Sequence, residues 1–124
     1  MAATTAAKRK LSGSTNGKAI KVVETATAGT LIHTATAQSN GTERDEVYLW
    51  ARNSHTADVL LTIEDGGVAD PDDLNEVTIP FNAGWVLVEP GMILDNGLVI
   101  RAFADQANVI TIRGFVNRIE QDAD

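Results

Sequence analysis

The chain has 124 residues, no cysteine and a formal net charge of −7 at pH 7. These values predict a single domain and exclude disulfides and thiolate metal sites. No apolar run approaches the ~20 residues of a membrane-spanning helix, and no apolar region follows the first basic residues as it would in a secretory signal.

The charge is divided unevenly along the chain. Residues 1–23 carry +5, whereas residues 24–124 carry −12. The first segment is rich in Ala, Thr, Ser and Gly and lacks apolar periodicity, so we expect residues 1–20 to form an extended basic arm, disordered in the free protein. Residues 21–124 are expected to form the folded body. The arm residues expected to contact a partner are Lys8, Arg9, Lys10 and Lys18.

Short segments of alternating apolar residues follow one another through the body. The segments expected to be strands are residues 19–24, 30–37, 46–53, 57–64, 74–79, 85–88, 92–95, 98–104 and 108–119. Strands at a spacing of about 8–12 residues, without a helical period, are typical of a β-sandwich or barrel. We therefore predict an all-β fold, an antiparallel β-sandwich with jelly-roll-like character and an extended N-terminal arm.

Three turns are predicted from residue type. Residues 53–56 separate two alternating segments and predict a hairpin. Asn96-Gly97 supplies two residues that tolerate positive φ, as a type I′ hairpin turn requires. Pro90-Gly91 predicts a further turn. The residues expected to fill the core are Val59, Leu61, Ile63, Ile100, Ile110 and Ile112.

The segment 46–53 carries the candidate interface. Its aliphatic face alternates with a face formed by Tyr48, Trp50 and Arg52. If the aliphatic face is buried, these three residues point outward, and their types are favoured at protein interfaces. The alternative is a strand buried on both faces, with Arg52 reaching the rim.

Signals for catalysis or metal binding are weak. His33 and His55 have no neighbours at ligand spacing, and zinc would need three or four ligands. The acidic residues 64–73 could bind Ca²⁺ through carboxylates and carbonyls, but they lack the alternate-position ligands of a calcium hand, and a solvated loop between two strands is the favoured interpretation. We expect no enzymatic activity, no catalytic residue, no metal and no cofactor. The acidic body also argues against nucleic acid as a partner, and no membrane partner is expected.

The body resembles small accessory structural proteins of tailed-phage particles, of the head-decoration (cement) type. The resemblance is carried by residues 47–53, 57–63, 80–91 and 94–102 and by Asn108, which opens the last strand. It implies a virion protein on the outer capsid lattice, assembled in the host cytoplasm and often trimeric. It also implies the major capsid protein and copies of itself as partners, and reinforcement of the head as the function. The alternative is a tail- or fibre-associated module for attachment or receptor binding.

Overall fold

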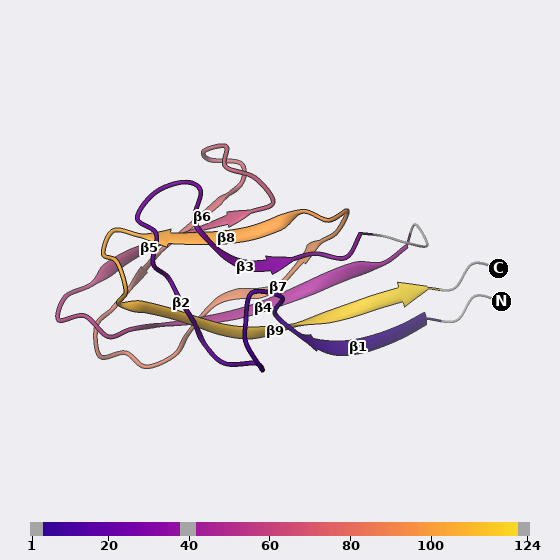
Figure 1. Ribbon diagram of the computed structural model, residues 1–124, viewed down its shortest axis with the longest axis horizontal. Coiled ribbons are helices and arrows are strands. Elements are labelled where there is room, and N and C mark those ends of the chain that lie inside the picture. The colour runs from indigo at the N-terminus through magenta and orange to yellow at the C-terminus, as the bar shows by residue number, and fades with distance from the viewer. Residues whose placement is uncertain (1–3, 38–41, 122–124) are drawn as a thin grey trace.

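The computed structural model describes residues 4–37 and 42–121, which contain two antiparallel sheets and no helix (Figure 1). The predicted arm begins, and the predicted body ends, in residues outside these ranges. Sheet A has the order β1-β9-β4-β7, with β2 also paired to β9, and sheet B has the order β3-β8-β5-β6. The strands are β1 (Thr4–Lys10), β2 (Ile20–Lys21), β3 (Thr30–Thr34), β4 (Arg44–Asn53), β5 (Val59–Asp65), β6 (Leu74–Ile79), β7 (Val86–Leu94), β8 (Val99–Ala104) and β9 (Ile110–Gln121).

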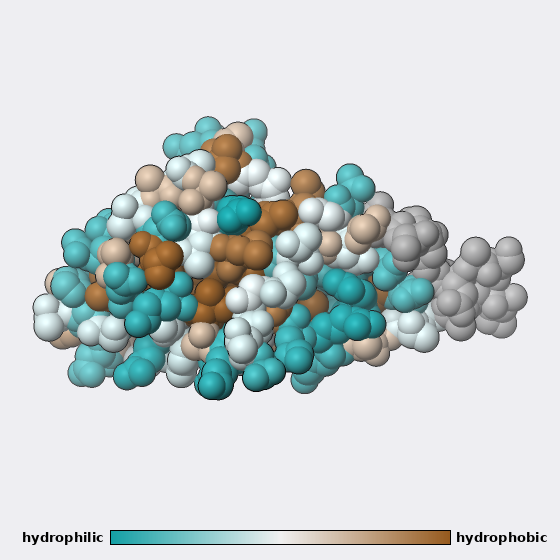
Figure 2. Space-filling view, in the orientation of Figure 1, coloured by the Kyte–Doolittle hydropathy of each residue, from teal (hydrophilic) through white to brown (hydrophobic). Residues whose placement is uncertain are grey.

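The two sheets pack face to face around an aliphatic core, so the predicted β-sandwich class is confirmed. The jelly-roll likeness stays a prediction. All six residues expected in the core are at most 1% exposed. In Figure 2 the apolar surface gathers in the middle of the view, where the sheets meet, and hydrophilic residues line the lower side, where sheet A lies. No helix among the described residues is long and apolar enough to cross a membrane.

The predicted hairpin at residues 53–56 is wrong. β4 pairs with β7 and β9 in sheet A, whereas β5 pairs with β6 and β8 in sheet B. The connection crosses between the layers because buried Asn53 fixes it: its Nδ2 donates to the carbonyls of Ala57 and Ile79, each at 2.9 Å, and its Oδ1 accepts from the His55 N–H at 2.8 Å.

The two later turns also differ from expectation. Asn96 and Gly97 do adopt positive φ, 57° and 68°, but the strands on either side of them belong to different sheets, so they do not form a hairpin. Pro90-Gly91 is not a turn. It lies inside β7, which pairs with β4 through two register shifts around Tyr48 and Leu49. An edge strand tolerates Pro because one side of its backbone has no partner.

The N-terminal segment is ordered where we expected disorder. β1 pairs antiparallel with β9 over its full length, although all seven of its residues are exposed. Backbone pairing needs no apolar side chain, so the sequence pattern gave no sign of it. Leu11 follows at once and is 2% exposed in the core, and the Gly13 N–H donates to the Ile32 carbonyl at 3.0 Å. The segment is therefore anchored as well as paired.

Candidate functional site

The outer face of sheet A gathers three of the six aromatic residues of the chain, Tyr48, Trp50 and Phe115. In β4 the aliphatic residues are 0% exposed, so Tyr48 and Trp50 point outward. Phe115 of β9 lies opposite Tyr48 in the ladder. The Tyr48 and Phe115 rings stack with centroids 4.9 Å apart, and those of Trp50 and Phe115 are 6.1 Å apart. Of the two arrangements left open for Tyr48, Trp50 and Arg52, the outward one is observed; their role as an interface stays a prediction.

The same face collects most of the positive charge. Residues directly opposite in a ladder share a face, so the β1–β9, β2–β9 and β4–β9 registers place six of the ten basic residues beside the aromatic rings. These six are Lys8, Lys10, Lys21, Arg44, Arg52 and Arg113. Among the described positions of these three ladders, Glu46 is the one acidic residue on the same face as Tyr48 and Phe115; Asp45 and Glu120 are on the opposite face. A local charge of +5 therefore stands on a protein whose net charge is −7. We call this surface the cationic face.

Two cations lie directly on aromatic rings. The Lys8 Nζ is 4.6 Å from the centroid of Phe115, and the Arg113 guanidinium is 5.2 Å from the centroid of Trp85. Such contacts contribute about 0.5–1 kcal/mol at exposed sites. Leu87 and Ile93 of β7 extend the face and are 50% and 58% exposed. The surface therefore has an apolar aromatic centre with charges around it.

The ring geometry limits what this face can bind. Base stacking on single-stranded nucleic acid needs free aromatic faces. Here the Tyr48 and Phe115 rings cover each other, and the Lys8 ammonium lies over Phe115. Aromatic and Arg side chains of this kind are enriched at protein interfaces.

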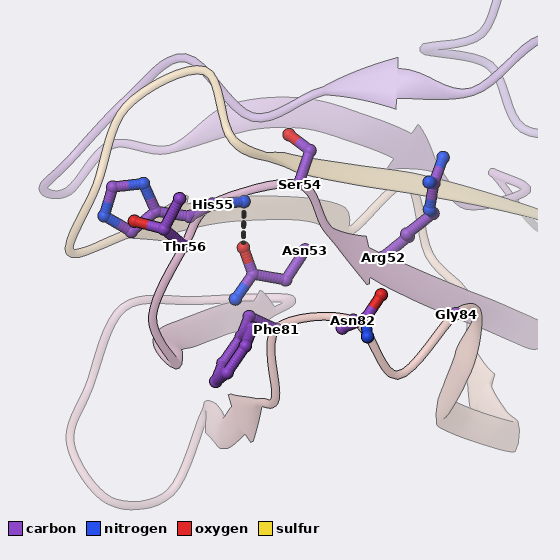
Figure 3. A pocket seen from close by; sticks show the side chains of 8 residues that line it. All are labelled: Arg52, Asn53, Ser54, His55, Thr56, Phe81, Asn82 and Gly84. Atoms are coloured by element: carbon purple, nitrogen blue, oxygen red, sulfur yellow. Dashed lines mark hydrogen bonds between the residues drawn. The ribbon is translucent and has the colours of Figure 1, made fainter.

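A hollow of about 560 Å³ lies at one end of the sandwich (Figure 3). Its lining residues are Arg52, Asn53, Ser54, His55, Thr56, Phe81, Asn82 and Gly84. Figure 3 shows that the His55 ring and the Arg52 guanidinium point to opposite sides and do not converge. Asn53 is occupied with its structural hydrogen bonds. The hollow therefore lacks the converging polar groups that a small-molecule site uses.

His33 belongs to a buried network that also includes Asp45, Arg118 and Ser12. The His33 Nε2 is 2.8 Å from Asp45 Oδ2, and the Ser12 N–H donates to His33 Nδ1 at 3.0 Å. Because Nδ1 is the acceptor, the ring proton is on Nε2, which donates a hydrogen bond to the Asp45 carboxylate. The Ser12 Oγ accepts from the Thr34 N–H at 2.6 Å and is not directed at the imidazole. The set contains Ser, His and Asp but lacks the geometry of a nucleophile with its base.

Asp45 is 0% exposed, and its partners keep it ionised. Burial by itself would raise the pKa of this carboxyl, but hydrogen bonds from Arg118 and His33, the Arg118 charge and the Thr36 N–H together hold the pKa below its ordinary value. The hydrogen bond to Asp45 in turn raises the pKa of Arg118. This network joins β3 of sheet B to β4 and β9 of sheet A at the end of the sandwich next to β1.

A second buried carboxyl, Glu89 of β7, is 2% exposed. Its Oε2 accepts from the Asn75 Nδ2 at 2.9 Å, whereas its Oε1 makes no hydrogen bond of standard geometry. Burial, and then the adjacent Asp65 carboxyl, raise the pKa of Glu89 to about 9. Burial and the Asp73 charge also raise the pKa of Asp65. Glu89 is therefore protonated at neutral pH.

No group of three or more His, Asp or Glu side chains in the described ranges is arranged to hold a metal ion. In the acidic segment 64–73, the Asp73 Oδ2 accepts the Ala69 N–H at 3.2 Å and so stabilises its own loop. Glu64 belongs to β5, is 2% exposed and accepts hydrogen bonds from the Thr27 Oγ1 and the Gly29 N–H, so the segment is not solvated throughout.

The structure separates the predicted partner-binding residues. Lys8 and Lys10 lie on the cationic face, while Arg9 pairs with Val116 and points to the other side of β1. Lys18 is exposed in the loop before β2. Lys21, Arg44, Arg113 and Phe115 were missed, because their side relative to Tyr48 depends on ladder registers between distant segments. Comparison with known proteins found no matching family model, curated protein or solved structure.

Proposed function

We propose that this protein is a non-enzymatic structural protein that docks through its cationic face onto an acidic protein surface, as an accessory protein of tailed-phage particles. The observation that supports it is the concentration of six basic residues around stacked Tyr48 and Phe115 on an otherwise acidic molecule. The proposal takes the partner to be the major capsid protein, following the resemblance of the body to decoration proteins.

A charged face on an oppositely charged molecule orients it during encounter with an acidic partner. Exposed ion pairs contribute only about 0–1 kcal/mol each, so affinity has to come from the aromatic centre together with Leu87 and Ile93. Several copies on one particle would add multivalency.

The test uses phage particles purified from lysates of cells in which the phage or prophage that encodes the chain has multiplied. Immunogold labelling in electron microscopy should place the protein on the head, and quantitative mass spectrometry should find hundreds of copies per particle if the lattice is decorated. Label confined to the tail, at a few copies, would instead support the tail or fibre module. Absence from particles would refute a virion function of either kind.

Matched charge variants test the docking face itself. Lys8→Glu with Arg113→Glu reverses two charges on the cationic face, and Arg9→Glu with Lys18→Glu makes the same net change elsewhere. The first pair should lower occupancy on particles stripped of the protein at least tenfold, and the second pair much less. Raising the salt concentration should weaken binding of the native chain. Equal losses for the two pairs would show that net charge, and not the cationic face, determines binding.

A further inference from the structure

The free edge of sheet A is formed by β1, which is regular and unpartnered on one side among the described strands. Its register with β9 runs without interruption from Thr4 opposite Gln121 to Lys10 opposite Phe115. All seven residues of β1 are exposed and none contributes to the core. A straight edge strand presents a row of backbone N–H and C=O groups to any chain that can pair with it.

The other sheet edges are less suited to pairing. β7 contains Pro90 and two register shifts, and β3 has a register shift between Leu31 and His33. β6 has a regular ladder with β5, but its Asn75 Nδ2 donates to the Val88 carbonyl of β7 at 3.0 Å, which holds this edge against the other sheet. Among the described strands, β1 is thus the edge that combines a regular ladder with no such tie to the other sheet.

We propose that β1 pairs antiparallel with β1 of a second copy around a two-fold axis at Ala7, joining the two A sheets into one continuous sheet. This inference does not depend on the proposed function. It concerns the backbone edge and not the cationic face, and it commits to a second copy of this chain as the occupant.

Symmetry and charge fix the register. A two-fold axis normal to the sheet leaves each side chain on its own face, and opposite residues must share a face. The axis must therefore pass midway between the two copies of one residue, which lie directly opposite each other. With Ala7 there, all seven residues pair, and the three cations of one strand oppose only small uncharged residues of the other: Lys8 faces Ala6, Arg9 faces Thr5 and Lys10 faces Thr4.

The two neighbouring centres are less favourable. An axis at Ala6 pairs only residues 4–8 and leaves Arg9 and Lys10 without partners in β1 of the second copy. An axis at Lys8 would place the two Lys8 side chains directly opposite each other, and like charges in that position are destabilising. Lysine on an edge strand usually discourages pairing. Here, however, the Lys8 Nζ is drawn over Phe115 of β9, away from the free edge. Small Ala6 and Ala7 leave the centre of the edge open.

The absence of cysteine from the chain makes a single-cysteine test possible. In the proposed register Ala7→Cys brings two thiols face to face within the Cα spacing that a disulfide needs. Thr5→Cys is the matched control, since it lies on the same side of β1 but faces Arg9 of the second copy. Under mild oxidation, the Ala7→Cys protein should form a disulfide dimer at least tenfold faster than the Thr5→Cys protein.

A mixed sample supplies the independent measurement. Thr5→Cys mixed with Arg9→Cys should form the heterodimer as fast as Ala7→Cys forms its homodimer, so the register can be tested even if one variant misfolds. Circular dichroism and melting temperatures check folding in each case. Disulfide formation that is no faster for Ala7→Cys than for Thr5→Cys, or a cysteine scan over residues 4–10 that peaks at another position, would overturn the proposal while leaving docking by the cationic face untouched.

Discussion

Asp45 and Arg118 lie opposite each other in the β4–β9 ladder, and the guanidinium donates two hydrogen bonds to the buried carboxylate, at 2.8 and 3.0 Å. His33 of sheet B bonds the same carboxylate, so one charged group ties both sheets together at the end of the sandwich next to β1. The Asp45 side chain is 0% exposed and that of Arg118 is 23% exposed. The negative charge of Asp45 is therefore stabilised by its hydrogen-bond partners and not by water.

Replacing Arg118 by Met should strongly destabilise the fold. The substitution leaves the Asp45 charge buried without its main partner, and removing one member of a buried pair costs about 3–5 kcal/mol. Denaturant unfolding measures the change. Arg113→Met, at an exposed position, serves as the control and should cost less than about 1 kcal/mol. Equal effects of the two substitutions would mean that the Asp45 network has no special role in stability.

Stability should fall as the pH rises from mildly acidic to alkaline values. In the unfolded chain Glu89 loses its proton near the ordinary value of 4.5, whereas in the folded protein the raised pKa of about 9 keeps the proton bound. Between these values unfolding releases a proton, so rising pH favours the unfolded state. Melting temperatures at pH 5, 7 and 9 should show the decline.

Glu89→Gln keeps a neutral side chain at every pH and should flatten most of this decline. Glu76→Gln removes a carboxyl from an exposed position of β6 and should leave the decline as it is in the native chain. If the native chain and Glu89→Gln lose stability in parallel between pH 5 and 9, the proton on Glu89 is not the cause.

Removing residues 2–10 should leave the sandwich folded, because every described residue in that segment is exposed. Leu11→Ala should instead cost about 2–5 kcal/mol, since Leu11 is 2% exposed in the core. If residues 1–20 were a disordered arm, a longer deletion over residues 2–18 would also leave the body folded. The structure revises this expectation, because that deletion also removes Leu11 and the Ser12 N–H bond to His33. Thermal unfolding of the three variants gives the comparison.

Gly114 should not tolerate a side chain. A Cβ at this position would collide with the backbone carbonyl of Tyr48 in β4, so Gly114→Ala has to push β4 and β9 apart. Forcing extra volume into a packed site typically costs about 1–3 kcal/mol, and here the neighbour is backbone, which cannot rotate away. Ser14→Ala removes one part-buried hydroxyl hydrogen bond and gives a scale for comparison. A smaller loss for Gly114→Ala in urea unfolding would contradict this assignment.

The period-two patterns predicted which residues are buried, because alternation along a strand is a local property. Val59, Leu61 and Ile63 are all 0% exposed, as expected. Which of the two sheets a strand joins is not a local property of its sequence. Residues 53–56 and Asn96-Gly97 have the composition of hairpin turns, but the choice between pairing within a sheet and crossing to the other is made by distant contacts such as that between Asn53 and Ile79.

The candidate site shows the same limit. Alternation placed Tyr48, Trp50 and Arg52 on one face of β4 but left open whether that face is buried; the structure shows that it is the outer one. The joining of Lys8 and Phe115 on that face required β1 to pair with a strand more than 100 residues away. Charge counts along the sequence separated a basic start from an acidic remainder, but they could not place Arg44, Arg52 and Arg113 beside the basic start.

The irregular β7 edge has a consequence for how far association can proceed. A sheet that offers two straight edges can add copies without end and grow into a fibre. Sheet A has one straight edge, β1, while the opposite edge is broken by Pro90 and two register shifts. A copy added at β1 would therefore present only another irregular edge. If the pairing proposed at β1 forms, growth of sheet A in that direction would stop at two molecules.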